Sequence, residues 1–187
     1  MDQRGLVEQA RRGDHDAFAA LALEAVARLD AAARLILRDR ELARDAVQDT
    51  LLGAWRNLPG LRDPDRFDAW LHRLLVRSCF DLLRHRHSRP IEVELPPTGG
   101  PRTADFASGV VDRELVDDAL RRLDPTWRAL VVMHYFLGMQ LPEAAAILGI
   151  PIGTAKSRLH RSLGLMRSAI ADDSRRDSGQ LARGHLA

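Results

Sequence analysis

Residues 141–170, LPEAAAILGIPIGTAKSRLHRSLGLMRSAI, are the stretch that decides the fold. A short apolar segment, a glycine at position 149 and a longer basic segment form the layout of two helices joined by a tight turn. Ala145 precedes Gly149 by four residues and is small enough to let the two helices cross closely. One face of the second helix is apolar, and the other carries Thr154, Lys156, Ser157, His160 and Arg161, with Arg158 at its edge.

This second helix is predicted to bind DNA. Short polar and basic side chains near the start of such a helix reach base edges in the major groove, while arginines suit phosphates. Residues 144–171 contain no acidic side chain that would repel DNA. An amphipathic hairpin without a ligand is the alternative, and it explains the turn glycine and the acid-free helix less well.

The remainder of the chain is predicted to be helical. Apolar residues recur at intervals of three and four, as in Val47, Leu51, Ala54 and Leu58, and no long stretch alternates as a strand would. Two Asp-Pro pairs, at 63–64 and 124–125, each place an N-cap acid before a proline suited to the first helical turn. Leu137-Gly138 and Leu148-Gly149 are typical helix ends. The predicted class is all-α.

The stretch 90–108 divides the chain, because it is rich in proline and glycine and has almost no apolar periodicity. We expect two small helical domains, 1–90 and 112–171, joined by a flexible acidic linker, 91–111. Residues 172–187 hold little apolar material and are predicted to form a disordered tail.

Charge is unevenly distributed along the 187 residues, although 28 Lys and Arg against 26 Asp and Glu leave a net charge of only +2. Residues 91–124 hold eight acids and four bases, whereas residues 125–171 hold five bases and one acid. The single cysteine, Cys79, excludes an internally disulfide-bonded scaffold and fits a reducing, cytoplasmic location. No apolar run is long enough for a membrane span.

A basic stripe is predicted on a helix that begins at Pro64. At 100° per residue, Arg73, Arg77 and Arg84 fall within about 20° of Arg66 and extend over about 27 Å. The predicted buried face carries Phe67, Leu71, Leu74, Ser78 and Leu82, and Trp70 lies between this face and the stripe. Arginines beside an aromatic ring suit single-stranded nucleic acid, which offers phosphates and unstacked bases. An ordinary solvated face is the alternative.

A third surface is predicted within residues 41–58. Asp45, Gln48, Asp49 and Leu52 lie opposite the apolar Val47, Leu51 and Trp55. An acidic face with an exposed leucine suits a protein partner better than DNA. A solvated face without a partner stays open as the alternative.

Sequence signatures of catalysis are absent. The chain contains no P-loop, GxGxxG, nucleophile elbow or zinc-ligand spacing, so we expect no enzymatic activity and no metal or cofactor. His134 is expected to be a partly buried core residue, and Cys79 a small buried hydrophobe.

Taken in order, these segments resemble the extracytoplasmic-function (ECF) sigma factors of the sigma-70 family, over about residues 5–170. The segments are GDHDAFAAL at 13–21, ARDAVQDTLLGAW at 43–55, PDRFDAWLHRLLVRSCFDLLRHRHSR at 64–89 and the stretch from Leu123 to Arg167. GTAKSRLHR, at 153–161, is close to the recognition-helix string most typical of that family.

The resemblance implies a promoter-specificity subunit of bacterial RNA polymerase that directs promoter recognition, melting and initiation. Residues 1–90 would be sigma region 2 and residues 112–171 sigma region 4. The implied partners are the β′ and β subunits of core polymerase, promoter DNA and an anti-sigma factor. The implied polymerase-binding residues are Asp45, Gln48, Asp49 and Leu52. The implied −10 residues are Arg66, Trp70, Arg73, Arg77, Asp81, Arg84 and Arg86. The implied −35 residues are Thr154, Lys156, Ser157, Arg158, His160 and Arg161.

Two rival interpretations remain open at this point. A conventional helix-turn-helix regulator would bind an operator without polymerase, and it leaves the 63–89 stripe unexplained. A nucleic-acid enzyme such as a small recombinase would require a nucleophile and clustered catalytic residues, which the sequence does not display.

Overall fold

The computed structural model describes the backbone of residues 2–88 and 109–184 and the side chains of residues 2–85 and 115–172. Every regular element in these ranges is helical, which confirms the all-α class. The first half holds α1 (Gln3–Arg11), α2 (His15–Leu37), α3 (Arg40–Asn57), the 3₁₀ turns η1 (Leu58–Gly60) and η2 (Pro64–Arg66), and α4 (Phe67–Ser88). The second half holds α5 (Gly109–Arg121), α6 (Pro125–Val131), the π-helical turn η3 (Val132–Phe136), α7 (Leu141–Ile147) and α8 (Ile152–Gly184).

Aspartate side chains fix the starts of most of these helices. Asp2, Asp14, Asp39 and Asp124 each accept a hydrogen bond from a backbone N–H of the first turn of α1, α2, α3 and α6. Asp63 does the same for η2. Each bond satisfies a donor that the helix itself leaves unpaired. Both predicted Asp-Pro starts are therefore confirmed.

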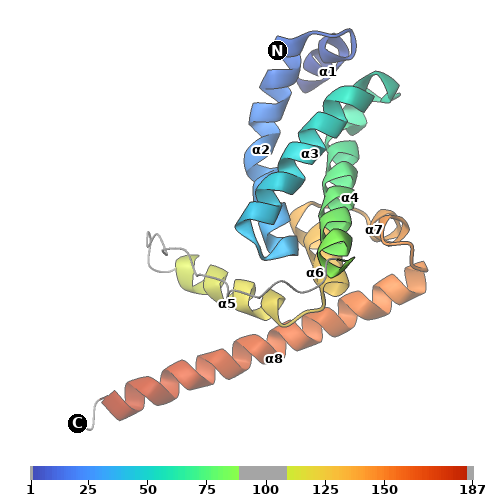
Figure 1. The fold of residues 1–187 in the computed structure, drawn as a ribbon. Coiled ribbons are helices and arrows are strands. Elements are labelled where there is room, and N and C mark those ends of the chain that lie inside the picture. Colours follow the sequence, from blue (N-terminus) through green and yellow to red (C-terminus); the bar gives the residue numbers. More distant parts are fainter. Residues whose placement is uncertain (1, 89–108, 185–187) are drawn as a thin grey trace.

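In the first half α2, α3 and α4 pack along one another, and α1 covers the far end of α2 (Figure 1). Their shared core contains the fully buried Leu21, Leu29, Ile36, Leu75 and Cys79. Because α3 is buried only on the side that faces α2 and α4, its opposite face stays open to solvent.

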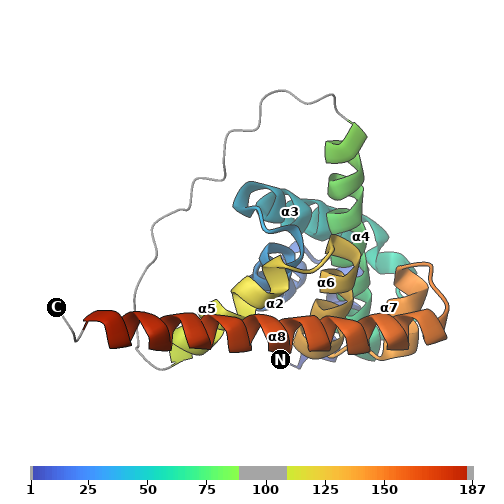
Figure 2. The same cartoon turned by 90° about the horizontal axis from the view of Figure 1, so that it is seen from below.

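The second half is organised by α8, which runs along one side of the molecule beneath α5, α6 and α7 (Figure 2). Gly138 and Gly149 close η3 and α7 with φ of 70° and 64°, the left-handed conformation that glycine adopts most readily. These are the two helix ends expected from Leu137-Gly138 and Leu148-Gly149.

Helix α8 also continues through Gly184, where we expected a disordered tail from residue 172. Residues 172–184 contain no proline, and most of them, apart from the glycines, are residue types that a helix tolerates. Extending a helix by a residue is much less costly than starting one, so α8 propagates into a stretch that has little apolar material of its own.

Helix α4 departs from its predicted geometry in two ways. The α-helix begins at Phe67, so Arg66 belongs to the preceding 3₁₀ turn and not to the same helical stripe. The buried positions include His72, Val76 and Cys79, outside the predicted face, whereas Leu74, Ser78 and Leu82 of that face are only half-buried. Helix α4 contacts α7 as well as α2 and α3, so three helices together determine which of its positions are buried.

The two halves share one continuous hydrophobic core, which the sequence did not indicate. Helix α2 packs against α6 and η3, and α4 packs against α7 (Figure 1). Polar bonds cross the same boundary: Arg28 Nη2 donates to the carbonyl of Phe136 at 3.1 Å, and Arg128 Nε donates to that of Ile36 at 2.9 Å. Within the described residues no helix is long and apolar enough to cross a membrane.

Cys79 is predicted to be chemically inert in the native protein. It is fully buried, and burial raises the pKa of its thiol to about 12, so the reactive thiolate is scarce near neutral pH. We expect Cys79 to resist Ellman's reagent until the protein unfolds. An Arg12→Cys variant, whose new thiol lies on the surface, is the positive control. Equal reaction rates at the two thiols would show that Cys79 is accessible.

Acid should destabilise the fold through His72. Burial and the charge of Arg28 lower the pKa of His72, whereas Asp68 and Glu143 oppose that change. As pH falls below about 6.5, the unfolded chain takes up a proton at this histidine and the folded chain does not. The free energy of unfolding therefore decreases as pH falls from about 6.5 toward the lower pKa that His72 has in the folded protein.

Urea unfolding measured between about pH 5 and pH 7 should show a smaller loss of stability in His72→Gln than in the wild type. His85→Gln, which changes an exposed histidine of the same helix, is the control. If His72→Gln and His85→Gln keep the wild-type dependence on pH, His72 does not carry the effect.

Candidate nucleic-acid and protein-binding surfaces

The outward face of α3 carries an acidic surface. Asp45, Gln48, Asp49 and Leu52 are all exposed, with Leu52 at 46% of its full accessibility. On the opposite face of α3, Ala46, Val47 and Ala54 are buried. The structure therefore places the four predicted residues together on one free face.

A groove lies beside this acidic surface, and the α2 residues that line it were not predicted from the sequence. It has a volume of about 540 Å³ and is lined mainly by apolar side chains: Val26, Ala27, Asp30, Arg44, Val47, Gln48, Leu51 and Leu52. Leu23, on the same helix, is 76% exposed. Leu23, Val26 and Ala27 recur at helical spacing, so a second apolar stripe on α2 was the signal that could have revealed the groove.

The predicted arginine stripe on α4 is only partly free. Arg77 is exposed, and Arg84 is exposed but forms an ion pair with Asp81 one turn earlier. Arg66, in η2, is exposed and lies 3.4 Å from an Asp63 oxygen. The side chain of Arg86 lies outside those that the structure describes.

Arg73 is engaged within the protein. Its Nε donates to Oε1 of Glu143, on α7, at 2.6 Å, and both side chains are half-buried. A residue expected to face nucleic acid is thus held by the first helix of the helix-turn-helix. The helical periodicity of the sequence placed Arg73 on a solvent-facing stripe, because periodicity takes no account of a neighbour from the second half.

Trp70 is half-buried between the core and the surface, as the helical periodicity of the sequence predicts. Its ring packs on that of Phe67, with centroids 6.0 Å apart and planes inclined at 45°. Phe67 is buried, so it anchors one side of the indole and leaves part of the other accessible. This arrangement can present a rigid aromatic surface to an unstacked base.

Helices α7 and α8 form the predicted helix-turn-helix. Ala145 and Ala155 are buried where the two helices meet. The backbone N–H of Ile150 bonds back to the carbonyl of Ala145 at 3.0 Å, and Gly149 provides the left-handed turn between the helices. Small side chains and a glycine turn therefore fix the angle at which α8 leaves α7.

The outer face of α8 carries the remaining predicted residues. Lys156, Ser157, His160 and Arg161 are exposed, whereas Thr154 and Arg158 are half-buried. The Ser157 hydroxyl donates to the carbonyl of Thr154 at 3.0 Å, which leaves its oxygen available to accept from a ligand. The face is basic and uninterrupted by acids, so it suits the edges and phosphates of a DNA groove.

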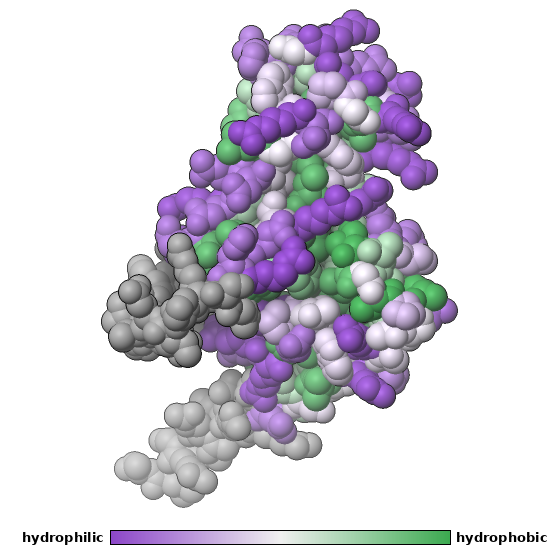
Figure 3. Space-filling model, turned by 45° about the vertical axis from the view of Figure 1, so that its right-hand side comes forward, coloured by the Kyte–Doolittle hydropathy of each residue, from purple (hydrophilic) through white to green (hydrophobic). Residues whose placement is uncertain are grey.

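Other apolar and polar features complete the surface. Tyr135, Phe136 and Ile152 are exposed in the second half, and Figure 3 shows apolar patches between polar side chains on one face.

His134 is half-buried, and its Nδ1 lies 3.0 Å from the carbonyl of Met139, as expected for a core histidine. Among the described residues no group of three or more His, Cys, Asp or Glu side chains could hold a metal ion.

Comparison with known proteins gives consistent matches in both halves. The family model "Sigma-70 region 2" matches residues 22–89, and "Sigma-70, region 4" matches residues 113–166. The ECF RNA polymerase sigma factor SigM of Mycobacterium tuberculosis is 35% identical over 150 residues, which cover 80% of this chain and 75% of SigM.

Similarity to CnrH extends over more of the chain. The RNA polymerase sigma factor CnrH of Cupriavidus metallidurans is 31% identical over 91% of this chain and 95% of CnrH. A solved structure of CnrH in complex with the cytosolic domain of CnrY has a TM-score of 0.64 and covers 91% of this chain and 98% of that one, at 30% identity. The sigma factor RpoE of Bartonella quintana, solved with the anti-sigma factor NepR, shares the fold, with a TM-score of 0.65, 24% identity and coverage of 82% of this chain and 96% of that one.

The close crossing of α7 and α8 should not tolerate a larger side chain. Ala145→Leu inserts atoms into a packed contact and is expected to lower the free energy of unfolding by about 1–3 kcal/mol. Ala146→Leu, at the exposed neighbouring position, should change it by less than about 0.5 kcal/mol. Urea denaturation of both variants measures the difference. Equal losses would mean that the crossing is not tightly packed.

Proposed function

The chain belongs to the ECF group of the sigma-70 family, and on this basis we propose that it directs bacterial RNA polymerase to promoters by recognising their −35 and −10 elements. The observation that carries the proposal is the presence of an acidic protein-docking face on α3 and a basic helix-turn-helix face on α8, both free to solvent in one chain. Each face suits a different macromolecule, as a subunit that links polymerase to DNA requires. The proposal is of a binding role without catalysis, exercised in the cytoplasm.

The α3 face is proposed to dock on the clamp coiled coil of the β′ subunit. Asp45, Gln48, Asp49 and Leu52 combine charge with one exposed apolar side chain, and the adjoining groove adds further apolar area. Complementary charges would orient the encounter, while burial of apolar surface would supply affinity.

Helix α4 and η2 are proposed to hold the nontemplate strand of the −10 element. Arg66, Arg77 and Arg84 would follow phosphates, and Trp70 would accept an unstacked base, with Asp81 and Arg86 beside them. Arg73 would join this surface only after its bond to Glu143 is released. Binding the single strand more tightly than the duplex would favour promoter melting without any chemical step.

Helix α8 is proposed to read the −35 element in the major groove. Lys156, Ser157, His160 and Arg161 are the exposed candidates for bases and phosphates, with Thr154 and Arg158 at the margin. Docking on polymerase would hold the −35 and −10 readers at the spacing of one promoter, so the two weak contacts would act as one bivalent contact.

The exposed acidic face of α3 favours this proposal over an independent operator-binding regulator. Such a regulator needs a helix-turn-helix, but it gives no use to the exposed acidic face of α3 or to the apolar groove beside it. CnrH forms a complex with the cytosolic domain of CnrY. That complex supports the further proposal that this chain also binds a regulatory protein of the anti-sigma kind.

Charge reversal on α3 and truncation on α8 should separate the two binding steps. Asp49→Lys is expected to weaken binding to core polymerase by about tenfold, because it replaces an attractive charge with a repulsive one. Arg161→Ala should leave core binding unchanged and reduce transcription from a promoter with the cognate −35 element by about tenfold.

Fluorescence titration with core polymerase and in vitro transcription measure the two effects, and each variant is the control for the other. Equal loss of core binding in both variants would show that the surfaces are wrongly divided. Failure of the wild-type chain both to bind core and to direct specific initiation would contradict the proposed function.

A further inference from the structure

The first turn of α8 presents a single exposed side chain, and that side chain is apolar. Ile152 is the first residue of α8 and retains 42% of its accessibility. Gly153 has no side chain, Thr154 is half-buried and Ala155 is buried. The exposed polar residues of the proposed −35 face begin only after this turn, at Lys156.

Packing of the helix-turn-helix does not account for an apolar residue at position 152. Ile150, two residues earlier, packs against the core, and its N–H bonds to the carbonyl of Ala145 to close the turn. Ala155 and Leu159 supply the buried side of the first turns of α8. The side chain of Ile152 is thus left in solvent, where a ligand can reach it.

The position of Ile152 at the start of α8 suits contact with bases. Recognition helices reach base edges in the major groove with the residues at their N-terminal end. Helix α8 begins at the end of the molecule where α7 lies (Figure 2). Because helical side chains lean toward the N-terminus, Ile152 lies ahead of Lys156 and Ser157 at the tip that would enter the groove.

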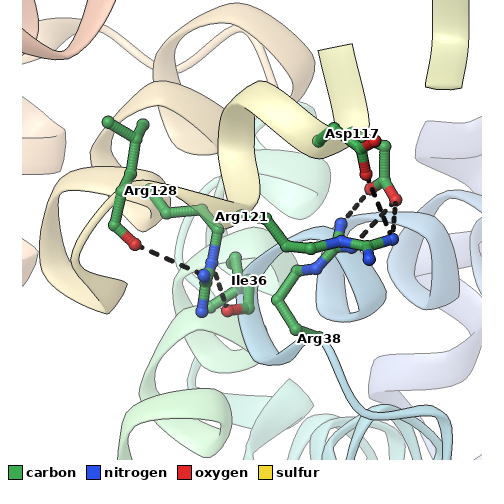
Figure 4. Close-up of polar contacts among 7 residues, drawn as sticks. Ile36, Arg38, Asp117, Arg121 and Arg128 are labelled. Atoms are coloured by element: carbon green, nitrogen blue, oxygen red, sulfur yellow. Dashed lines mark hydrogen bonds and ion pairs between the residues drawn. The ribbon is translucent and has the colours of Figure 1, made fainter. Parts of the chain in front are cut away.

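Two arginines elsewhere in the second half already have partners within the protein (Figure 4). Arg128 donates to the carbonyl of Ile36 at 2.9 Å, and Arg121 forms an ion pair with Asp117 at 3.4 Å. Discrimination among bases by the second half therefore depends on the side chains of α8.

The exposed polar side chains of α8 leave one feature of the major groove unread. Lys156 and Arg161 can donate to the O6 and N7 acceptors of guanine. Ser157 gives its proton to the carbonyl of Thr154, so its oxygen can accept from the amino group of adenine or cytosine. These contacts involve polar atoms only, and they do not register the 5-methyl group of thymine.

The side chain of Ile152 has no polar atom, so a thymine methyl is the base feature that it can contact favourably. Against a polar base edge it would displace water without replacing the hydrogen bonds that the water made. Against the methyl group it would bury apolar surface on both partners.

We propose that Ile152 is a specificity-determining residue that selects a thymine in the −35 element through contact with its 5-methyl group. This role rests on the proposed function, because it requires α8 in the major groove of a promoter. Burial of one methyl group favours binding by about fourfold, which sets the expected preference for thymine over the same base without its methyl.

Selection from random duplex DNA tests the proposal. The full chain, assembled with purified core polymerase, is used to enrich bound sequences, in parallel with Ile152→Ala and Leu165→Ala. Leu165 is the matched control, because it is 52% exposed on the same helix but lies about 20 Å further along it. We expect the wild type and Leu165→Ala to enrich one −35 element that contains a thymine. Ile152→Ala should lose the preference at that position and keep the others.

Replacement of that thymine by uracil isolates the methyl group, because the two bases differ in nothing else. In competition binding, uracil should weaken the wild-type and Leu165→Ala complexes about fourfold and leave the Ile152→Ala complex unchanged. Ile152→Val keeps a branched apolar side chain and should restore sensitivity to the methyl. A purely structural role for Ile152 would weaken binding to the thymine and uracil duplexes alike and keep the difference between them.

Equal sensitivity of the wild type and Ile152→Ala to uracil at every thymine of the element would overturn the proposal. So would a selected element without thymine on either strand, or a uniform loss of binding in Ile152→Ala. These outcomes leave the proposed function intact. Failure of the wild-type assembly to enrich any −35 element would contradict the proposed function and, with it, the role of Ile152.

Discussion

The bond from the buried Arg128 guanidinium to the end of α2 is the constraint on which the arrangement of the two halves depends. A buried charge is costly unless polar groups surround it, and Arg128 finds its partners in the carbonyls of Ile36 and Leu123. One carbonyl belongs to each half. Separating the halves would remove the cap from α2 and expose the guanidinium together with the apolar surfaces of α2, α6 and η3 that now share a core.

This contact determines which of the three proposed binding surfaces stay fully exposed to solvent. The second half approaches α2 and α4 from the side opposite the free face of α3, so the acidic surface and its groove stay open. Helix α8 lies along the outside of the second half and exposes its basic face. Only α4 is affected directly, because Glu143 reaches Arg73. Domain packing is therefore linked to the proposed −10 surface through one arginine, Arg73, which Glu143 engages.

Much of the local structure could be predicted from the sequence, because it depends on neighbours along the chain. Aspartate caps, glycine helix ends, the small Ala145 and the exposed faces of α3 and α8 are of this kind. Contacts between distant segments could not be predicted, since helical periodicity shows which face is apolar but not which helix will cover it. Arg73 and Glu143 are 70 positions apart, and both look like surface residues when read locally. The buried role of Arg128 and the displaced buried face of α4 have the same origin, whereas the second apolar stripe on α2 is visible in the sequence.

An NMR spectrum of the arginine Nε–H groups in the free, full-length chain tests the central claim most directly. With the two halves packed as in the structure, the Nε–H of Arg128 is buried and donates to Ile36, so it should exchange slowly with water and show nuclear Overhauser effects to protons at the end of α2. Rapid exchange of this proton, with no contact to α2, would contradict the account, because the halves would then be independent in solution.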